Sequence, residues 1–492
     1  MSSYRVSFPR EGICYDAQEG MTLLEVQIAA GIVPNAPCGG GGKCGKCTVI
    51  VDGKQVLACQ TKVTGDVSVQ TLAGERHAHI LGQGAVQSVP FDPKPIPAGV
   101  EHPLLAAVDI GTTSVVVYLL DGQTGERLGV RSMLNPQRQF GGDVIARGSY
   151  AMANGGQELS RCIHGAVNDL LGQLTDRRQD VVDITMVGNS CMHHLFLGYP
   201  MDSLMLAPYT PVVTEAVCRP AAQCGITAHP DCQVRWLPNI GGFVGADTTG
   251  CMLAAGLPRE GEVTLLVDIG TNGEMVLSMD GRMASCSTAA GPAFEGAKIE
   301  CGMRGSDGAI DKVWVEDGTL RFHVIGDTAP MGLCGSGLLD AVRCLLEFGH
   351  VQPSGRMEET YVFATGVYLS QKDIRELQLA KAAIAAGVEL LCAHMGITPE
   401  KIDRLLLAGA FGNYLDPVSA CGIGLLPPVL LERIVPIGNA AGEGAVLAAR
   451  NRGQWQKSQT LAREVTFLEL AMDPEFQDVY VDQLPFGEED DE

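Results

Sequence analysis

The stretch "AVDIGTTSVVVYLLDG" at residues 107–122 recurs as "LVDIGTNGEMVLSMDG" at residues 266–281, and the two copies align without gaps. Each copy has an apolar run, a short Gly-Thr turn and a second apolar run, which predicts a strand, a tight turn and a returning strand. A repeat at domain-length spacing predicts two similar halves. We expect these halves over residues 104–258 and 259–485, facing each other across a cleft that holds a ligand.

The two repeated turns predict phosphate binding. No Walker motif G-x-x-x-x-G-K-[ST] occurs in the chain, so backbone N–H groups of the turns would hold the phosphates. A single Asp-Gly turn is often only a hairpin, but its duplication favours a paired site for ATP. Asp109 and Asp268, one in each copy, are expected to hold a hydrated magnesium ion. The expected phosphate-binding residues are Gly111, Thr112 and Thr113 in the first copy and Gly270, Thr271 and Asn272 in the second.

This region resembles the superfamily of acetate and sugar kinases, Hsc70 and actin. The resemblance implies an adenosine-binding turn in the second half, and "LLLAGAFGNYL" at residues 405–415 matches it with Gly409 and Gly412. A second turn, "PIGNAAGEGA" at residues 436–445, ends a strand at Gly438 and opens an alanine-rich helix, whose N-terminus could face phosphate or ribose. The alternative is that these glycines only allow close packing of strand and helix.

Other polar residues of the two halves give weaker signals. "VGNSCMHHLFLG" at residues 187–198 contains His193 and His194. Adjacent residues of a strand point to opposite faces, so we expect a structural or partner-facing role rather than metal binding. Glu295 and Asp307 could orient water, or they could be solvated loop charges. Cysteines without a ligand spacing are expected to be core thiols: Cys14, Cys286, Cys301 and Cys334.

The segment "PCGGGGKCGKC" at residues 37–47 places three cysteines in a glycine-rich loop. With Cys59 they give C-x5-C-x2-C-x11-C, which has one residue more in the first gap than the plant-type 2Fe-2S pattern. Glycines let such a loop wrap a cluster and turn N–H groups toward sulfur. Zinc is the main alternative, but its sites usually combine two separated C-x2-C pairs. The expected cluster ligands are Cys38, Cys44, Cys47 and Cys59.

These residues resemble the 2Fe-2S ferredoxin family of β-grasp fold, and the resemblance covers residues 1–73. Short strand-like runs there flank one helical segment, "TLLEVQIAAG", in which Thr22 can act as the N-cap. Residues 74–103 are rich in Pro and Gly without an apolar period and are expected to be a linker. Residues 486–492 form an expected acidic tail.

Composition limits the class of protein. A formal net charge of -22 over 492 residues disfavours nucleic acid and anionic lipid as partners. We find neither a signal peptide nor a run of about 18 apolar residues, which predicts a cytoplasmic protein without a membrane partner. The expected fold is a multidomain α/β chain, in which a small β-grasp ferredoxin-like α+β domain precedes a duplicated actin-like (ribonuclease H-like) α/β ATPase.

A ferredoxin-like domain followed by a duplicated DIGT ATPase resembles the reductive activators of corrinoid enzymes, and the likeness extends through "VTFLELAMDPEFQDVYVDQLPF" at residues 465–486. The resemblance implies an ATP-hydrolysing enzyme that returns an inactive Co(II) corrinoid protein to Co(I). Its 2Fe-2S cluster would pass the electron, and ATP with Mg²⁺ would drive the step. The implied partners are a corrinoid protein of a methyltransferase system and a low-potential electron donor, and a homodimer is compatible with the resemblance.

Two other functions fit the same motifs. One is an ATP-dependent electron-transfer activator of another low-potential metalloenzyme. The second is a redox-sensing binding protein in which the ATPase fold is not catalytic, although retention of both Asp109 and Asp268 speaks against it. Longer members of the activator family carry an additional region between ferredoxin and ATPase, whereas here only the residues of the expected linker separate them.

Overall fold

The computed structural model describes most of the chain, and its gaps are concentrated near the N-terminus. The described residues are 3–9, 12–30, 32, 40, 42, 47–51, 53–71 and 89–487. Two of the expected cluster ligands, Cys38 and Cys44, lie outside the described residues, as do residues 72–88 of the expected linker and residues 488–492 of the expected tail.

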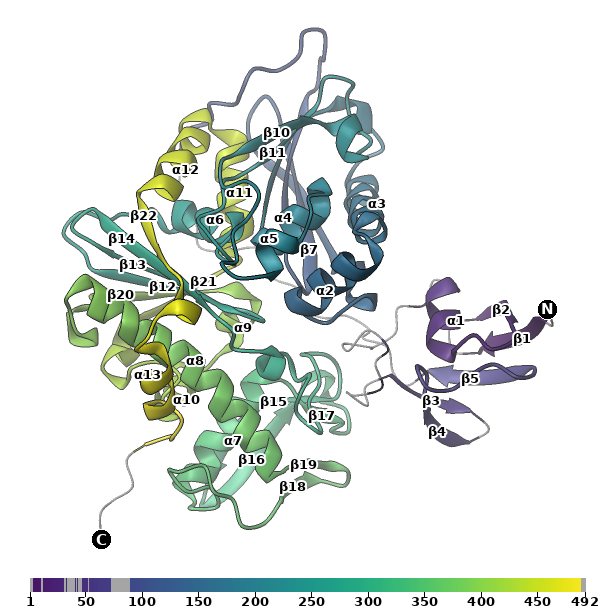
Figure 1. Ribbon diagram of the computed structural model, residues 1–492, viewed down its shortest axis with the longest axis vertical. Coiled ribbons are helices and arrows are strands. Elements are labelled where there is room, and N and C mark those ends of the chain that lie inside the picture. Colours follow the sequence, from purple (N-terminus) through teal and green to yellow (C-terminus); the bar gives the residue numbers. More distant parts are fainter. Residues whose placement is uncertain are drawn as a thin grey trace.

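The N-terminal domain is a five-stranded sheet with one helix (Figure 1). Its strand order is β2-β1-β5-β3-β4, with β1 parallel to β5 in the middle, which confirms the predicted β-grasp fold. Thr22 caps helix α1 as predicted: its Oγ1 accepts the N–H of Glu25, whose carboxylate accepts the N–H of Thr22. The elements are β1 (Ser3–Phe8), β2 (Ile13–Gln18), α1 (Leu23–Ala29), β3 (Thr48–Val51), β4 (Lys54–Leu57) and β5 (Val67–Thr71).

Two six-stranded sheets dominate the rest of the protein, and they share a five-strand core in which β11-β9-β6-β7-β8 corresponds to β21-β20-β12-β13-β14, while the sixth strand lies on opposite edges. The first has the order β10-β11-β9-β6-β7-β8 and the second the order β21-β20-β12-β13-β14-β22. The first sheet contains β6 (Leu104–Ile110), β7 (Ser114–Asp121), β8 (Arg127–Leu134), β9 (Val181–Gly188), β10 (Val217–Pro220) and β11 (Gln233–Trp236). The second contains β12 (Thr264–Ile269), β13 (Gly273–Met279), β14 (Arg282–Thr288), β20 (Arg404–Ala408), β21 (Ile434–Gly438) and β22 (Val465–Leu468).

The repeated sequence forms equivalent hairpins at the centre of these sheets. In the first copy β6 pairs antiparallel with β7 and parallel with β9; in the second, β12 pairs antiparallel with β13 and parallel with β20. The predicted strand, turn and returning strand are therefore confirmed in both halves. The carboxyl ends of β6 and β12 bring both Gly-Thr turns to one place between the halves.

Helices α6 (Ala246–Ala255) and α11 (Ala440–Arg450) lie between the two sheets (Figure 1). They contact each other extensively, and α11 also packs on β6 and β9. Helix α11 follows β21 of the second sheet in sequence, but its apolar face belongs to the core of the first half. The remaining first-half helices are α2 (Val144–Asn154), α3 (Gln157–Leu174), α4 (Ser190–Leu197) and α5 (Asp202–Met205).

The second half carries an inserted subdomain beside its sheet, visible in the lower part of Figure 1. Its strands are β15 (Ala309–Glu316), β16 (Thr319–Val324), β17 (Gly332–Leu333), β18 (Tyr361–Ala364) and β19 (Val367–Leu369). The other helices here are α7 (Gly335–Glu347), α8 (Gln371–Met395), α9 (Gly409–Tyr414), α10 (Pro417–Gly422), α12 (Arg452–Glu464) and α13 (Phe476–Asp482).

Helix α8 is the one helix in the described residues that is long and apolar enough to cross a membrane, and 78% of its most apolar window is buried inside the protein. It packs against β13, β14 and α13. Its apolar composition is therefore that of a core helix of the second half.

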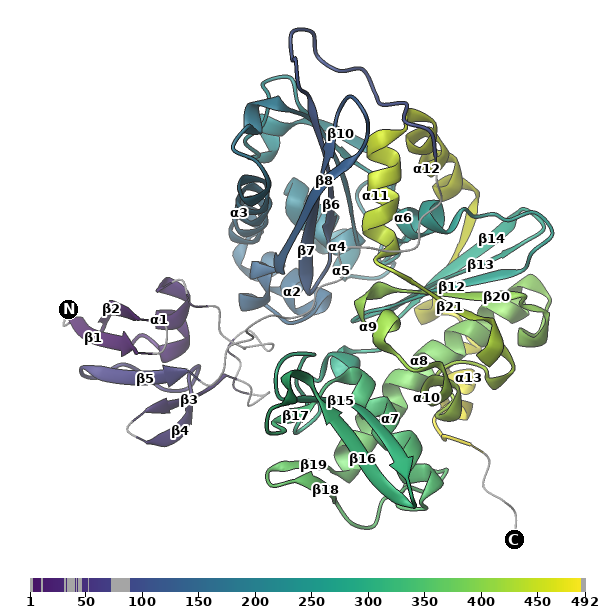
Figure 2. The ribbon, with the colours of Figure 1, turned by 180° about the vertical axis from the view of Figure 1, so that it is seen from behind.

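Residues 89–103 are fixed on the surface of the first half and helix α11 rather than forming a free linker. Lys94 is only 7% exposed, and its Nζ donates to Asp183 Oδ1 at 3.2 Å and to the carbonyl of Ala448 at 2.9 Å. Asp92 exchanges backbone hydrogen bonds with Arg450 and Arg452. The segment passes α12 before it enters β6 (Figure 2).

Two further expectations about single residues are wrong. Cys14 is exposed on β2 rather than in the core, because the alternation along this strand puts its side chain on the solvent face. Phe486 is buried and its N–H donates to the carbonyl of Pro353, so the acidic tail begins after this residue.

We predict that Lys94→Met destabilises the two-sheet part of the protein by about 3 kcal/mol, because it removes a cation from a buried charged network and leaves Asp183 with Arg235 as its remaining charged partner. Urea unfolding followed by tryptophan fluorescence would measure this, since Trp455 lies beside Lys94. The matched control is Arg452→Ala, which breaks an exposed pair with Asp92 and should cost less than about 1 kcal/mol. Equal losses in the two variants would contradict the anchoring role of Lys94.

Candidate functional site

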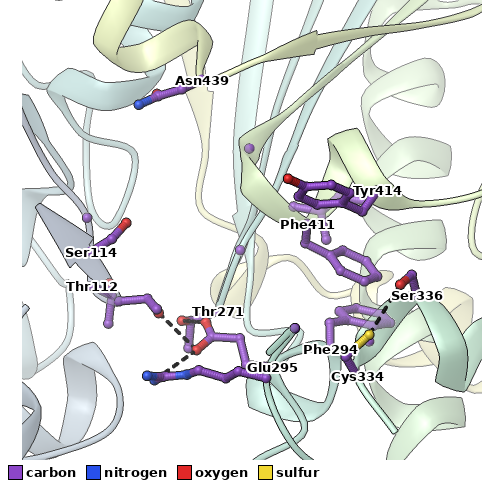
Figure 3. A pocket seen from close by; sticks show the side chains of 18 of the residues that line it. Thr112, Ser114, Thr271, Phe294, Glu295, Cys334, Ser336, Phe411, Tyr414 and Asn439 are labelled. Atoms are coloured by element: carbon purple, nitrogen blue, oxygen red, sulfur yellow. Dashed lines mark hydrogen bonds and ion pairs between the residues drawn. The ribbon is translucent and has the colours of Figure 1, made fainter. Parts of the chain in front are cut away.

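A cavity of about 600 Å³ lies between the two halves, a size suited to a nucleotide. Thr112 and Ser114 line its first-half wall, whereas Phe294, Phe411 and Tyr414 gather on the second-half side (Figure 3). Nearly all the predicted nucleotide residues line this one cavity: Asp109, Gly111, Thr112, Thr113, Asp268, Gly270, Thr271, Asn272 and Gly409. Two separate halves of the sequence therefore meet at one site.

The two Gly-Thr turns use part of their hydrogen-bonding capacity internally. The N–H of Gly111 donates to the carbonyl of Ser114, and the N–H of Gly270 donates to that of Asn272, both at 2.9 Å. Both glycine N–H groups thus have an acceptor within their own turn, and phosphate binding by Gly111 and Gly270 stays a prediction. Within the described residues the remaining N–H groups of the turns have no acceptor: those of Thr112, Thr113, Thr271 and Asn272.

Four carboxylates converge at the base of the cavity. Sequence analysis identified Asp109 and Asp268 but missed Asp247, in the first turn of α6, and Glu274, at the start of β13. Burial raises the pKa of Asp109 to about 7, and the negative charge of Asp268 adds to this effect. Burial and the same neighbouring charge raise the pKa of Asp247 to about 8. The pKa of Asp268 rises to about 6 by burial, and burial with the charge of Asp247 raises that of Glu274 well above its ordinary value.

This donor set suits a hydrated magnesium ion rather than a directly ligated metal. In the described part of the chain no three His, Cys, Asp or Glu side chains are close enough together to hold an ion directly. Magnesium dehydrates reluctantly and usually keeps several waters, which carboxylates hold by hydrogen bonds. The raised pKa values, caused first by burial, show that the surrounding side chains stabilise the ionised carboxylates too little to offset their loss of water, so a cation fits here.

The predicted adenosine-binding glycines have different roles. Gly409 has φ +88°, and a Cβ there would lie 2.4 Å from Asp268 Oδ1, so its absence makes room for the carboxylate cluster. Gly412 and Gly438 do not line the cavity. A Cβ on Gly412 would lie too close to the side chain of Leu407, so this glycine allows close packing of helix and strand. Gly438 directly precedes Asn439, the N-cap of α11.

Asn439 is a site residue that sequence analysis missed. Its Nδ2 donates to Asp109 Oδ2 at 2.9 Å and to the hydroxyl of Tyr118 at 3.1 Å, while its Oδ1 accepts the N–H of Gly442. The first turn of α11 is thereby attached to the carboxylate cluster. A strand ending in Gly-Asn before an alanine-rich helix is the signal that could have identified this N-cap.

An aromatic wall at the opposite end of the cavity offers a place for a base. Phe294 and Phe411 are stacked with ring centroids 5.0 Å apart and planes 18° apart. Beside them, Cys334 and Ser336 lie at the beginning of α7, where Cys334 is buried but faces the cavity. Of the two other predicted core thiols in this half, Cys286 is buried, and Cys301 is only partly buried.

Glu295 connects the two repeated turns. Its Oε1 accepts the hydroxyl of Thr271 at 2.5 Å and its Oε2 accepts that of Thr113 at 2.9 Å. Of the two proposed water-orienting carboxylates it is the one in the cavity, because Asp307 is exposed and does not line it.

The histidine motif is helical, contrary to the expectation of a strand. His193 and His194 lie on α4 and both are fully buried. His194 Nδ1 bonds the carbonyl of Ser190, and its Nε2 accepts the N–H of Val212. A structural role fits this burial, whereas a partner-facing role does not. The residue of this motif that reaches the cavity is Asn189, whose Nδ2 donates to Thr112 Oγ1 at 3.0 Å.

In the N-terminal domain, the two described cluster cysteines lie close together. Cys47 precedes β3 and Cys59 follows β4, and the carbonyl of Cys47 accepts the N–H of Ala58 at 2.8 Å. Both thiols are buried. Gly40 and Gly42 have φ of +89° and +71°, so these loop positions use the conformational freedom of glycine.

Comparison with known proteins accounts for the whole arrangement. Residues 8–64 match the 2Fe-2S iron-sulfur cluster binding domain, residues 104–260 the RACo middle region, and residues 262–492 the C-terminal ASKHA domain of RACo. The corrinoid activation enzyme RamQ of Eubacterium limosum is 32% identical over 98% of this chain and 99% of its own length. The chain belongs to the family of corrinoid activation enzymes. The predicted fold class, with a ferredoxin-like domain before an actin-like ATPase, is confirmed.

Two other proteins related to this family support the assignment. The [Co(II) methylated amine-specific corrinoid protein] reductase of Methanosarcina barkeri is 26% identical over 77% of this chain and 76% of its own length. The solved structure of a reductive activator for corrinoid, iron-sulfur protein superposes with a TM-score of 0.71 at 28% identity, covering 97% of both chains. In this corrinoid activation enzyme family, the 2Fe-2S domain and the ATP-binding ASKHA domain thus occur together.

We predict that the metal-free protein becomes less stable as pH rises from about 4 to about 8. The unfolded chain releases the protons of Asp109, Asp247 and Asp268 near pH 4, whereas the folded protein releases them only between about pH 6 and about pH 8, so unfolding is favoured as pH increases through this window. Thermal unfolding in EDTA should show this trend, and Mg²⁺ should raise the midpoint more at pH 8 than at pH 5.5.

The variant Asp247→Asn should flatten both the pH dependence and the Mg²⁺ effect. Asp307→Asn is the control, because it removes an exposed carboxylate outside the cavity and should leave both unchanged. A midpoint that Mg²⁺ raises equally at both pH values would show that the carboxylate cluster does not bind the ion.

Proposed function

We propose that this protein uses ATP to return a corrinoid protein from the inactive Co(II) state to Co(I). The observation that carries the proposal is a single chain that combines a ferredoxin-like domain with two repeated Gly-Thr turns lining one cavity. An uphill one-electron step of roughly 0.2 V costs about 5 kcal/mol, which electron transfer alone does not supply. Nucleotide binding and hydrolysis can supply this free energy, while the ferredoxin-like domain transfers the electron.

Different residues of the cavity bind different parts of the nucleotide. The free N–H groups of Thr112, Thr113, Thr271 and Asn272 bind the phosphates, and the aromatic wall around Phe411 holds the base. When bound, Mg²⁺ neutralises charge on the phosphates and on the four carboxylates. Asp109, Asp247, Asp268 and Glu274 would hold it through waters. During hydrolysis a water oxygen bonds to the terminal phosphorus while the bond to the ADP oxygen breaks.

The electron follows a separate route. The cysteines Cys38, Cys44, Cys47 and Cys59 would hold the 2Fe-2S cluster, which supplies one-electron chemistry when bound. Reduction of Co(II) to Co(I) requires one electron, which the cluster held by these cysteines would supply, and the balance requires a low-potential donor that replaces it. The corrinoid protein belongs to a methyltransferase system, and the process takes place in the cytoplasm.

ATP contacts both halves of the ATPase, so its binding can change how they are arranged. Helix α11 touches the carboxylate cluster through Asn439 at one end and contacts Lys94 through its last carbonyls at the other. Residues 89–103 lead back toward the ferredoxin-like domain. A structural change at the nucleotide can therefore reach the segment that connects the two domains. In a homodimer this connection would be present in each subunit.

The direct test is anaerobic reduction of a Co(II) corrinoid protein with a low-potential donor, followed by the absorbance of Co(I). Co(I) should form with ATP and not without nucleotide. Equal reduction with ATP, with a non-hydrolysable analogue and without nucleotide would overturn the proposal. Hydrolysis that ignores every corrinoid protein would instead favour activation of another low-potential metalloenzyme, and absence of hydrolysis would favour the redox sensor.

We predict that Asp268→Asn lowers ATP hydrolysis and ATP-dependent Co(I) formation by roughly 100-fold, because it removes a charge from the proposed magnesium site. The visible spectrum of the cluster should be unchanged, since the ferredoxin-like domain has its own core. Phosphate release and Co(I) absorbance are the measurements, with Asp307→Asn as the matched control. Full activity of Asp268→Asn would contradict the magnesium assignment.

We predict the opposite pattern for Cys59→Ser. This variant should lose the visible absorbance and the electron paramagnetic resonance signal of the cluster, and with them Co(I) formation, while ATP hydrolysis persists. Cys14→Ser is the control, because its thiol is exposed on β2 and lies outside the cluster motif. A normal cluster spectrum in Cys59→Ser would mean that another residue is the fourth ligand.

A further inference from the structure

The carboxylate of Glu295 occupies the space between the two repeated turns. It ends a short helical turn at Pro292–Glu295 and is held by Thr113 from the first half and Thr271 from the second. These hydrogen bonds connect parts of the chain that belong to different sheets. The two turns are therefore bridged by a negative group of the protein itself.

The surroundings of this carboxylate are those of an anion site. An Nη of Arg304 lies 3.8 Å from Glu295 Oε2. Arg147 is fully buried nearby, where its Nη2 donates to the carbonyl of Thr112 at 2.6 Å. Burial lowers the pKa of Arg147 to about 10, and the charge of Glu295 opposes this shift, so the guanidinium stays positive at neutral pH. Two hydroxyls and the Arg304 guanidinium thus lie next to a single carboxylate, and the charge of Arg147 acts on it from the first half.

A phosphate group bound between the turns would accept hydrogen bonds from the same hydroxyl groups. Each threonine hydroxyl has one hydrogen, so it cannot donate to Glu295 and to a phosphate oxygen at the same time. The terminal phosphate of a nucleotide held between the two turns must compete with Glu295 for Thr113 and Thr271. ADP has no such phosphate and can leave the bridge in place.

We propose that Glu295 is an internal stand-in for the terminal phosphate of ATP, and that its displacement distinguishes ATP from ADP. In the nucleotide-free protein Glu295 joins the halves through Thr113 and Thr271. ATP takes over these hydroxyls, whereas ADP leaves them with Glu295. This inference rests on the proposed function, because it requires that the cavity binds an adenine nucleotide.

The test compares wild type, Glu295→Ala and Glu295→Gln, each as the full anaerobic chain with Mg²⁺, by titration calorimetry with a non-hydrolysable ATP analogue and with ADP. Charge-assisted hydrogen bonds contribute enough that Glu295→Ala should bind the analogue about tenfold more tightly. ADP affinity should change less than about twofold. Glu295→Gln should lie between, because an amide accepts the hydroxyls without the charge.

Asp307→Asn removes a nearby negative charge without touching the bridge and controls for general electrostatics. Equal gains for the analogue and ADP in Glu295→Ala, or weaker binding of the analogue, would overturn the proposal while leaving the proposed function intact. Failure of the wild type to bind either nucleotide would overturn the proposed function and this inference with it.

Hydrogen exchange gives a second readout. Without nucleotide, Glu295→Ala should exchange faster than wild type at the amides of Gly111 and Gly270, the hydrogen-bonded N–H groups of the two turns, because the connection between the turns is lost. Addition of the analogue should remove this difference, since the phosphate then bridges the turns in both proteins. Identical exchange in the two nucleotide-free proteins would overturn the bridging role, and an unchanged cluster spectrum and unfolding midpoint would show that the variant is folded.

Discussion

Four carboxylates meet where the two half-sheets converge, and their burial in one place is the constraint on which the other parts of the site depend. Asp109 and Asp268 come from equivalent central strands, Asp247 from α6, and Glu274 from the strand that returns after the second turn. Burial raises the pKa of all four carboxyl groups, and neighbouring negative charges add to this effect for Asp109, Asp247 and Glu274, so ionisation of the cluster favours a bound cation. The polar partners at the cluster, including the amide of Asn439 and the thiol of Cys251, are single contacts that do not supply a positive charge.

The helices between the sheets connect this cluster with the rest of the molecule. Asp247 lies in the first turn of α6, and Asn439 is the N-cap of α11. Both helices that separate the sheets therefore have their N-terminal ends at the site. At the far end of α11, the carbonyls of Ala448 and Ala449 accept the Nζ of Lys94, a cation placed at the negative pole of the helix. One rigid element thus spans from the nucleotide cavity to the segment that arrives from the ferredoxin-like domain. This arrangement gives a physical basis for communication between nucleotide hydrolysis and electron transfer.

The sequence predicted the central strands well because they are repeated. Two segments with the same apolar runs and the same turn are expected to form the same hairpin, so each copy supports the interpretation of the other. It also predicted Thr22 as an N-cap and most of the residues that line the cavity. It failed for His193 and His194, because an apolar segment with two histidines fits a strand and a helix equally well by periodicity. It failed for Lys94 because a charged residue among prolines gives no sign of burial, and burial here comes from α11, far along the chain.

What the sequence alone determined is local or repeated: the duplicated DIGT turns, the glycine-rich cysteine loop, and the order of the ferredoxin-like and ATPase domains. What only the tertiary structure decided is which distant side chains meet. Asp247 and Glu274 join the carboxylate cluster, and Glu295 connects Thr113 with Thr271, because chain segments from two sheets converge between the halves. No spacing in the sequence encodes these contacts. They arise when packing of α6 and α11 brings the ends of β6 and β12 together, and the loss of water there gives the charged groups their altered properties.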